Sequence, residues 1–321
     1  AVPGPADPRV ALYWPWLPGG EARQRQLRQE IVATRGCDAG CCRVDVHYSW
    51  DCLRRLCQAR EEAGKTIYVD SVVVPEDAPE ELLRLAWTSS PKVYSVGKKL
   101  MVKHVCAEGS GRNSCMFTTI FPVSRPLAAL RAPVIVLEDA ESASVVGQIL
   151  RTAYHFGVDS AVVSESVWDM LGGRACRVSM GWAYHLDFHV ALSMPTALRG
   201  LRARGVELFA VAPARGPCAA GPRAAHRGGW GLVVGRGGAP SAAALAQCGG
   251  RVPVALRREG GLAAAQAAAL GLYELGARGV EVREADASIG EHEPRPFMVA
   301  RGPSESGGDR FMLECTGTHV G

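Results

Sequence analysis

The sequence lacks an apolar run long enough to cross a membrane, and it lacks a strong excess of one charge. Its longest apolar runs, such as Val134 to Leu137, are far shorter than the roughly 18 to 20 residues that a membrane helix needs. The formal net charge is only +4, so any affinity for nucleic acid must come from local clustering of the 36 Lys and Arg residues. We therefore expect a soluble protein with no membrane partner.

A disulfide framework is not expected either. The 11 cysteines are an odd number, scattered from Cys37 to Cys315 in a chain that is long enough to bury a core without covalent staples. This usage favours a reducing compartment. The chain starts at Ala1 without a signal peptide, which we interpret as a start left after removal of an organellar transit segment.

What the sequence does contain is an ordinary globular composition, 47% hydrophobic and 21% charged, over 321 residues, enough for about two domains. Residues 1–43 are too short for a core of their own and are predicted to be an N-terminal extension. Residues 44–123 alternate strand and helix patterns and predict a small α/β domain. A proline-bracketed linker is predicted at residues 124–133, and a glycine-rich C-terminal extension at 276–321.

Residues 134–275 predict a second α/β domain. Apolar runs of strand length alternate with amphipathic helical stretches, which implies a mainly parallel sheet covered on both faces. The expected strands are 134–137, 160–163, 207–211 and 231–234, and the expected helices are 146–156, 166–171, 195–204 and 262–275.

The segment from Val134 to Asp159 resembles, without a gap, the first motif of the SpoU/TrmH family of RNA ribose methyltransferases. That motif is a strand followed by Asp-Pro-x-Asn-x-Gly-x-x-x-Arg-Thr-Ala and then Phe-Gly. The matching residues are Gly147, Arg151, Thr152, Ala153, Phe156 and Gly157. Ser179 to Leu186 resembles the family's Ser-x-Gly-x-x-x-His-Leu element, and Gly235 and Val252 begin segments placed where the second and third motifs belong.

The resemblance implies a SPOUT-type α/β domain with a deep trefoil knot, and a dimer that builds each site at a two-fold interface. It also implies that residues 44–123 are similar to the family's substrate-binding domain, itself similar to a small ribosomal protein. The candidate RNA-binding residues are then Lys98, Lys99, Lys103 and Arg151. For the three lysines, a solvated surface is the alternative.

Five motif positions depart from the family pattern, and four of them are polar in the family. The Asn position of the first motif carries Val145, the Glu and last Gly of the second carry Gly237 and Pro240, and the Ser and Asn of the third carry Gly261 and Ala263. Arg151 is the only catalytic motif residue retained. Methyl transfer to a ribose hydroxyl needs an aligned and partly deprotonated oxygen, so these losses favour a catalytically degenerate protein.

Binding of S-adenosylmethionine stays open, because backbone groups can hold a cofactor after the polar side chains are gone. The residues placed for such contacts are Gly235, Gly238, Val252, Val254 and Leu262. Pro240 contributes no N–H, so the loop cannot keep the family's full hydrogen-bond pattern.

Two other groups of residues contain potential metal ligands. Cysteines at positions 37, 41, 42, 52 and 57 have some character of a zinc site, yet buried free cysteine is the favoured interpretation and no metal is predicted. His185 and His189 flank Asp187, but His185 stands where the family has a structural histidine. The arginines at 199, 202 and 204 are interpreted as a solvated helix edge.

Three hypotheses for function follow. The first is an RNA-binding scaffold, a degenerate SpoU/TrmH-like protein acting on large-subunit ribosome assembly in a mitochondrion, as a homodimer or paired with a related SPOUT protein. The second is an active S-adenosylmethionine-dependent 2′-O-ribose methyltransferase that works with altered residues around Arg151 or is completed by a partner's residues. The third is a protein-interaction module in which the knotted domain serves only as a dimerisation platform.

Overall fold

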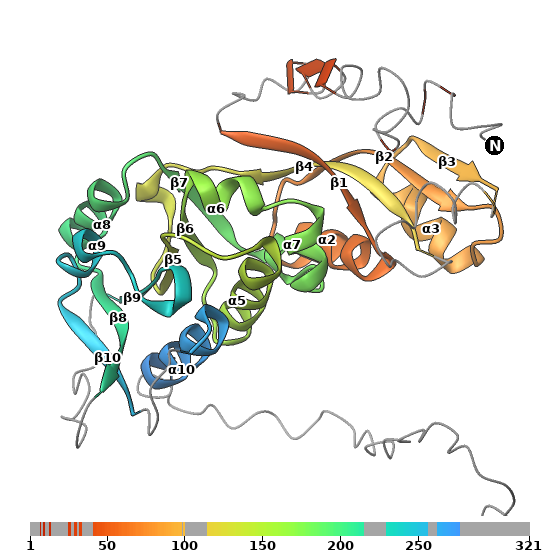
Figure 1. The fold of residues 1–321 in the computed structure, drawn as a ribbon. Helices are drawn as coiled ribbons and strands as arrows, with labels where there is room; N and C mark the ends of the chain where they lie inside the picture. The colour runs from red at the N-terminus through yellow and green to blue at the C-terminus, as the bar shows by residue number, and fades with distance from the viewer. Residues whose placement is uncertain are drawn as a thin grey trace, which may run out of the picture. The chain divides into compact units, whose positions relative to one another are not determined.

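Two β-sheets organise the part of the chain that the computed structural model describes (Figure 1). The described residues are 41–97, 114–214, 229–255 and 262–276, with Lys99 and a few isolated positions before residue 41. The predicted C-terminal extension and nearly all of the predicted N-terminal extension lie outside these ranges. No helix within them is both long and apolar enough to span a membrane.

The first sheet has four strands in the order β1-β4-β2-β3. The strand β4 pairs antiparallel with β1 and β2, whereas β2 and β3 are parallel. Its elements are β1 (Cys42–Tyr48), α2 (Trp50–Glu62), β2 (Tyr68–Pro75), α3 (Glu80–Ser89), β3 (Val93–Val96) and β4 (Met116–Val123). The helix α2 begins at Ser49, whose hydroxyl accepts a hydrogen bond from the Cys52 N–H at 3.2 Å.

The second sheet has six strands in the order β10-β8-β9-β5-β6-β7, and every neighbouring pair is parallel. This confirms the predicted parallel sheet. Its strands are β5 (Val134–Leu137), β6 (Ser160–Ser164), β7 (Asp187–Ala191), β8 (Glu207–Ala214), β9 (Trp230–Val234) and β10 (Gly250–Ala255).

Helices connect these strands. They are α5 (Ala143–His155), α6 (Glu165–Met170), α7 (Gly173–Val178), α8 (Met194–Ala203), α9 (Ala242–Leu245) and α10 (Ala264–Gly276), with 3₁₀ turns η3 (Leu127–Ala129), η4 (Trp182–His185) and η5 (Arg236–Gly238).

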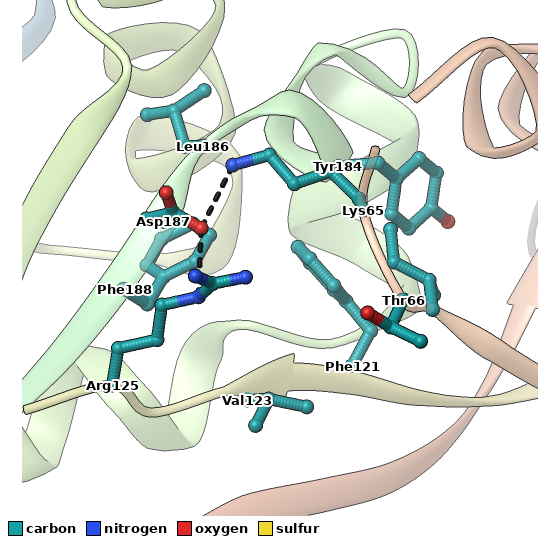
Figure 2. Close-up of a pocket in the computed structure, with 10 residues that line it drawn as sticks. Lys65, Thr66, Phe121, Val123, Arg125, Tyr184, Leu186, Asp187 and Phe188 are labelled. Atoms are coloured by element: carbon teal, nitrogen blue, oxygen red, sulfur yellow. Dashed lines mark ion pairs between the residues drawn. The ribbon is translucent and has the colours of Figure 1, made fainter. Parts of the chain in front are cut away.

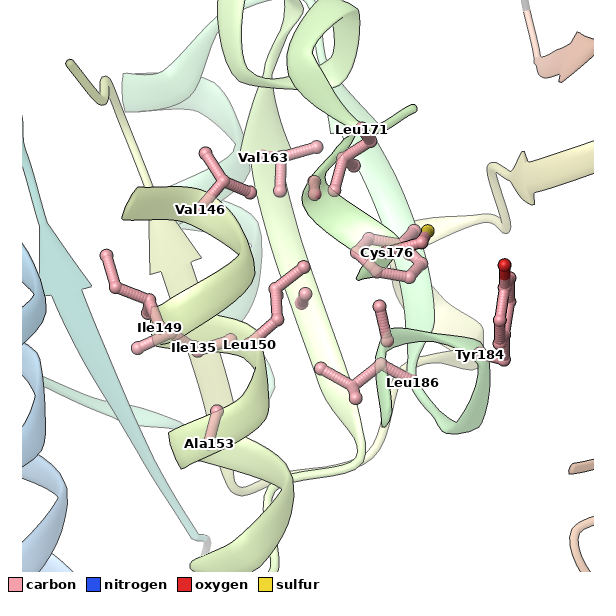
Figure 3. Close-up of a cluster of buried hydrophobic side chains, with 14 of the residues drawn as sticks. Ile135, Val146, Ile149, Leu150, Ala153, Val163, Leu171, Cys176, Tyr184 and Leu186 are labelled. Carbon is pink, nitrogen blue, oxygen red and sulfur yellow. The ribbon is translucent and has the colours of Figure 1, made fainter. Parts of the chain in front are cut away.

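Alternation along the central strand β5 explains why both faces of this sheet are covered. Ile135 and Leu137 pack into one hydrophobic layer with α5 and α10, while Val134 and Val136 pack into another with α8. Figure 3 shows Val146, Ile149, Leu150 and Ala153 of α5 within the first layer. Full burial of each such Val, Ile or Leu side chain stabilises the fold by about 1.5 to 3 kcal/mol.

The two sheets share one continuous hydrophobic cluster. Leu53 and Phe117 of the first sheet's layer belong to the same cluster as Ile135 of the second. The chain also makes a parallel bridge between Ser124, which follows β4, and Phe188 of β7. The predicted boundaries at residues 44–123, 124–133 and 134–275 remain a prediction, since both sheets lie within one compact unit that spans residues 1–280.

In the second sheet and its helices, the sequence patterns do not indicate α9 (Ala242–Leu245) or three further elements. These three are α7, β7 and β10, and the two strands form the two edges of the six-stranded sheet. The strand β10 contains Pro253, which removes a donor and is tolerated at a sheet edge. The strand β7 contains both buried and partly exposed residues and carries Asp187 and His189, so it lacks the continuous apolar run of a central strand.

Candidate functional site

The carboxyl ends of β5 and β9 form the starting point of the candidate site. Leu137 and Val234 are paired at the ends of these adjacent parallel strands, so Glu138 and Gly235 leave the sheet side by side. The strand order also reverses here, because β6 and β7 lie to one side of β5 while β8, β9 and β10 lie to the other. In open α/β sheets, ligands bind at such a crevice.

A tight glycine loop, η5, follows β9. Gly237 and Gly238 have φ values of 65° and 86°, a left-handed backbone that favours glycine. A Cβ placed on Gly235 would lie 2.3 Å from the carbonyl oxygen of Ala239, so this turn also needs glycine for close approach. The Gly238 N–H donates to the Gly235 carbonyl at 3.0 Å, which closes the loop on itself.

Acidic residues directly after β5 hold this loop. The Gly237 N–H donates to the Glu141 carboxylate at 2.6 Å. Arg236 donates through Nε to Asp139 at 2.8 Å, and this hydrogen bond lowers the pKa of the Asp139 carboxyl. Nothing in the sequence motifs predicts these contacts, because they join residues almost a hundred positions apart.

A third carboxylate fixes the end of the loop. Glu138 accepts from the backbone N–H of Ser241 at 2.6 Å and from its hydroxyl, and the Ser241 hydroxyl in turn caps α9 through the Ala244 N–H at 3.2 Å. The backbone N–H groups of Gly237, Gly238 and Ser241 are therefore bonded to the protein's own carboxylates and carbonyls.

The residues predicted for cofactor contacts are only partly brought together. The Leu262 carbonyl oxygen lies 3.6 Å from the position of a Cβ on Gly238, so Leu262 lies beside the loop. Val252 and Val254 lie on β10, two strands away from β9, where they pair with Val211 and Pro213 of β8.

The substituted motif positions offer no polar side chain where the structure describes them. Val145 is half-buried on α5 and packs against the hydrophobic cluster. Pro240 is half-buried in the loop, and Ala263 is exposed just before α10. Gly261 lies outside the described residues.

Arg151 is exposed on α5, and its side chain makes no hydrogen bond or ion pair with any residue in the described ranges. It follows Val145 by six residues, which in an α-helix is about 9 Å along the axis and about 240° around it. These two motif positions therefore face different sides of α5, and one chain does not bring the Arg151 side chain to the place of the lost Asn.

The candidate RNA-contact lysines lie mostly outside the described residues. Lys99 is described and exposed, whereas Lys98 and Lys103 are not described. The interpretation of this group as an RNA-contact surface stays a prediction.

No group of three or more potential metal ligands occurs among the residues that the structure describes. Cys42 and Cys52 are buried in β1 and α2, and Cys41 is exposed. Burial raises the pKa of the Cys52 thiol to about 12, so it is a thiol rather than a thiolate near neutral pH.

His185 and His189 both contact other residues of the fold. His185 is buried and packs against Tyr154 and Trp182, at centroid distances of 4.9 and 5.3 Å, and burial lowers its pKa. His189 lies on β7 with its Nδ1 2.8 Å from the Arg125 carbonyl oxygen.

Comparison with solved structures defines the class of fold. The chain is similar to the SpoU methyltransferase AviRb from Streptomyces viridochromogenes in complex with AdoMet, with a TM-score of 0.60 and 15% identity over 84% of this chain and 96% of that chain. It is similar to an AdoMet-bound rRNA methyltransferase from Sinorhizobium meliloti, with a TM-score of 0.59 and 14% identity over 84% and 92% of the two chains. The fold is that of the SpoU methyltransferases.

The sequence of the second sheet and its helices matches a known family. Residues 132–273, less than half of the chain, match the SpoU rRNA Methylase family. This confirms the resemblance on which the sequence prediction depends. Uncharacterised tRNA/rRNA methyltransferases from Mycobacterium bovis and Mycobacterium tuberculosis are 35% identical over 157 residues, 47% of this chain and 54% of theirs. The chain thus spans about half the length of these curated relatives.

Proposed function

We propose that this protein is an RNA-binding member of the SpoU/TrmH group that has lost methyl transfer. It acts as a scaffold on ribosomal RNA during assembly of the large ribosomal subunit in a mitochondrion. The observation that carries the proposal is the contrast between an intact fold and a site without its polar side chains. Val145, Pro240 and Ala263 cannot orient or deprotonate a ribose hydroxyl.

The glycine loop gives independent support. Relatives with this fold are named as AdoMet complexes. In this chain the Gly237 and Gly238 N–H groups are bonded to Glu141 and to the Gly235 carbonyl, so they are not available as donors to a ligand. The residues present therefore do not fit the cofactor in the loop as folded. A ligand would have to displace Glu141 from the loop.

The RNA-binding half of the proposal depends on the first domain of the chain. The exposed Lys99 lies in the basic stretch of this region, and RNA affinity arises chiefly from phosphate neutralisation by such side chains. The variant in which Lys98, Lys99 and Lys103 are all changed to Glu should bind RNA more weakly and with a shallower salt dependence. Unchanged RNA binding would favour the protein-interaction alternative.

We further propose a dimer in which α5 and α10 of two copies pack together, and a trefoil knot formed by the segment from β9 to α10. The two helices lie side by side (Figure 1), with Gly276 next to Phe156. Leu270 and Tyr273 on α10 are 40% and 57% exposed, and Phe156 is 38% exposed. Large exposed apolar side chains on neighbouring helices are typical of a subunit interface. The partner is a second copy or a related SPOUT protein.

The deciding experiment measures cofactor binding and methyl transfer on the same preparation. Calorimetric titration with S-adenosylmethionine and S-adenosylhomocysteine should give no heat, and incubation with radiolabelled S-adenosylmethionine and ribosomal RNA should give no labelled RNA. Micromolar binding, about 8 kcal/mol, together with labelled RNA would contradict the proposal and support the active-methyltransferase alternative.

One observation favours the active-methyltransferase alternative and defines a second experiment. Arg151 is retained, exposed and without a partner within the described ranges, so it is free to reach a site on another subunit. If methyl transfer occurs, Arg151→Ala should abolish it while leaving RNA association intact. Under the scaffold proposal, Arg151→Ala changes neither property, since no reaction takes place.

A further inference from the structure

A small pocket lies at the seam between the two sheets, away from the glycine loop (Figure 2). It has a volume of about 40 Å³, which is room for a few water molecules. That space suits a single oxyanion group and is too small for a nucleobase. The lining residues come from the α2–β2 connection, from β4 and the segment after it, and from the segment from η4 into β7: Lys65, Thr66, Ile67, Phe121, Val123, Arg125, Tyr184, Leu186, Asp187 and Phe188.

Two cations converge on one carboxylate in this pocket. The Lys65 Nζ lies 2.7 Å and the Arg125 Nε lies 3.0 Å from the same oxygen, Oδ1 of Asp187. Figure 2 shows the three side chains pointing toward one another. Asp187 is the only acidic residue in the lining, so the pocket carries one net positive charge.

Hydrogen-bond donors exceed acceptors by a wide margin. An ammonium has three N–H donors and a guanidinium has five, whereas a carboxylate offers about four lone-pair sites. Within the part of the chain that the structure describes, the side chains of Lys65 and Arg125 have no partner besides Asp187. An added oxyanion would find several unfilled donors.

Burial strengthens the preference for an anion. The Lys65 side chain is only 12% exposed and Asp187 only 25%, while Arg125 at 46% keeps the pocket open to a ligand from solvent. An excess of positive charge in partly desolvated surroundings is costly, and a bound anion relieves that cost.

The charged groups are held in place by the backbone. The Lys65 N–H donates to the Ala59 carbonyl at 3.1 Å, and the Arg125 N–H donates to the Phe188 carbonyl at 2.7 Å. The Asp187 N–H donates to the Asp159 carbonyl at 2.8 Å. A preorganised set of donors loses little conformational freedom when a ligand binds.

The aromatic wall is packed edge to face. Phe121 contacts Tyr184 and Phe188 at centroid distances of 4.8 and 5.7 Å, so these rings are fixed against one another. An apolar wall lowers the local dielectric and strengthens the attraction between the two cations and an anion.

We propose that this seam pocket binds one phosphate group, and that the group is a phosphodiester of bound RNA. The assignment of the phosphate group to RNA rests on the proposed function, whereas the affinity of the pocket for phosphate does not. Because residues of both sheets line the pocket, an RNA strand seated there would contact both halves of the chain.

The test uses the full chain with two probes, inorganic phosphate and a fluorescein-labelled single-stranded oligouridylate. Phosphate binding is measured as the rise in Tm relative to chloride at equal ionic strength, and RNA binding by fluorescence polarisation. The variants are Lys65→Gln, Arg125→Gln and Asp187→Asn. The matched control is Lys92→Gln, which breaks the surface ion pair that Lys92 makes with Asp70 at 3.0 Å on the same sheet.

We expect Lys65→Gln and Arg125→Gln to remove the phosphate-dependent rise in Tm and to reduce the slope of log affinity for RNA against log salt by about 1 each. Asp187→Asn should do the opposite and bind phosphate more tightly, because it leaves two cations without a counter-charge. A purely structural ion pair predicts instead that all three variants lose stability and that phosphate affects them equally. Lys92→Gln should match the wild type.

The outcomes separate the pocket from the proposed function. If RNA binding persists in every variant and phosphate changes no Tm, the proposed phosphate site is wrong and the proposed function is unaffected. If Lys65→Gln loses phosphate binding but the protein binds no RNA, the phosphate site is supported and the proposed RNA-binding function is wrong. If Lys65→Gln fails to fold, the gain of phosphate affinity in Asp187→Asn decides, and its absence overturns the proposal.

Discussion

His47 makes the stability of this protein depend on pH in a way that can be calculated. The imidazole is fully buried, with its Nδ1 2.6 Å from the Tyr184 hydroxyl and its ring 5.7 and 6.2 Å from those of Phe117 and Phe121. Its Nε2 has no partner among the described residues. Burial lowers the His47 pKa from 6.5 to about 4.

The direction follows from proton linkage. Because the His47 pKa is lower in the folded state, the unfolded chain binds more protons between pH 6.5 and pH 4, and protonation favours unfolding. The stabilisation that the neutral ring provides is complete above pH 6.5 and is lost as the pH falls toward 4. A shift of that size corresponds to about 3 kcal/mol in the free energy of unfolding.

The measurement is urea unfolding followed by tryptophan fluorescence from pH 7 to pH 4. The variant His47→Phe keeps an aromatic ring and cannot titrate. It should lose about 1 kcal/mol at pH 7, because Tyr184 loses a hydrogen-bond partner, and it should lose about 3 kcal/mol less than wild type on acidification. The control His155→Gln removes an exposed imidazole and should retain the wild-type slope. The reasoning is refuted if His47→Phe keeps the full acid dependence.

Other predictions concern the motif glycine, the loop and the interface. Gly147→Ala should lower the free energy of unfolding by about 1 to 3 kcal/mol in chemical denaturation, because the new Cβ would lie 2.4 Å from the Ala175 carbonyl oxygen; unchanged stability would show that α5 and α7 can separate. Glu141→Gln should speed hydrogen exchange at the Gly237 amide, since a neutral amide accepts that bond less strongly than a carboxylate. Tyr273→Asp should convert a dimer to a monomer in sedimentation, and a dimer that persists places the interface elsewhere.

The central strands of the parallel sheet are predictable from the sequence because they are buried on both faces. The run from Val134 to Leu137 is apolar at every position, and the structure places it between two hydrophobic layers. The edge strands β7 and β10 lack such an apolar run. An edge strand has a neighbouring strand on one side only, so it tolerates Asp187 or Pro253.

The candidate site is predictable only where a motif is local in the chain. The glycine loop at Gly235 could be located from its sequence, but its binding by Glu141 joins residues 96 positions apart. The seam pocket is harder still, because Lys65, Arg125 and Asp187 come from three separated segments and belong to no motif. A search for charged residues directly after buried elements would find Glu138 and Asp139, although not their partners.

The bridge between Ser124 and Phe188 has a consequence for how this protein behaves at high concentration. Exposed strand edges are templates on which other chains add, and they are a common starting point for aggregation. The chain leaving β4 already bonds to β7 there, with the Arg125 N–H donating to the Phe188 carbonyl and Ser124 accepting from the Val190 N–H. At the opposite edge, Pro253 has no N–H to offer. Neither edge presents an uninterrupted row of backbone donors to a neighbouring molecule, which guards a long parallel sheet against edge-to-edge stacking.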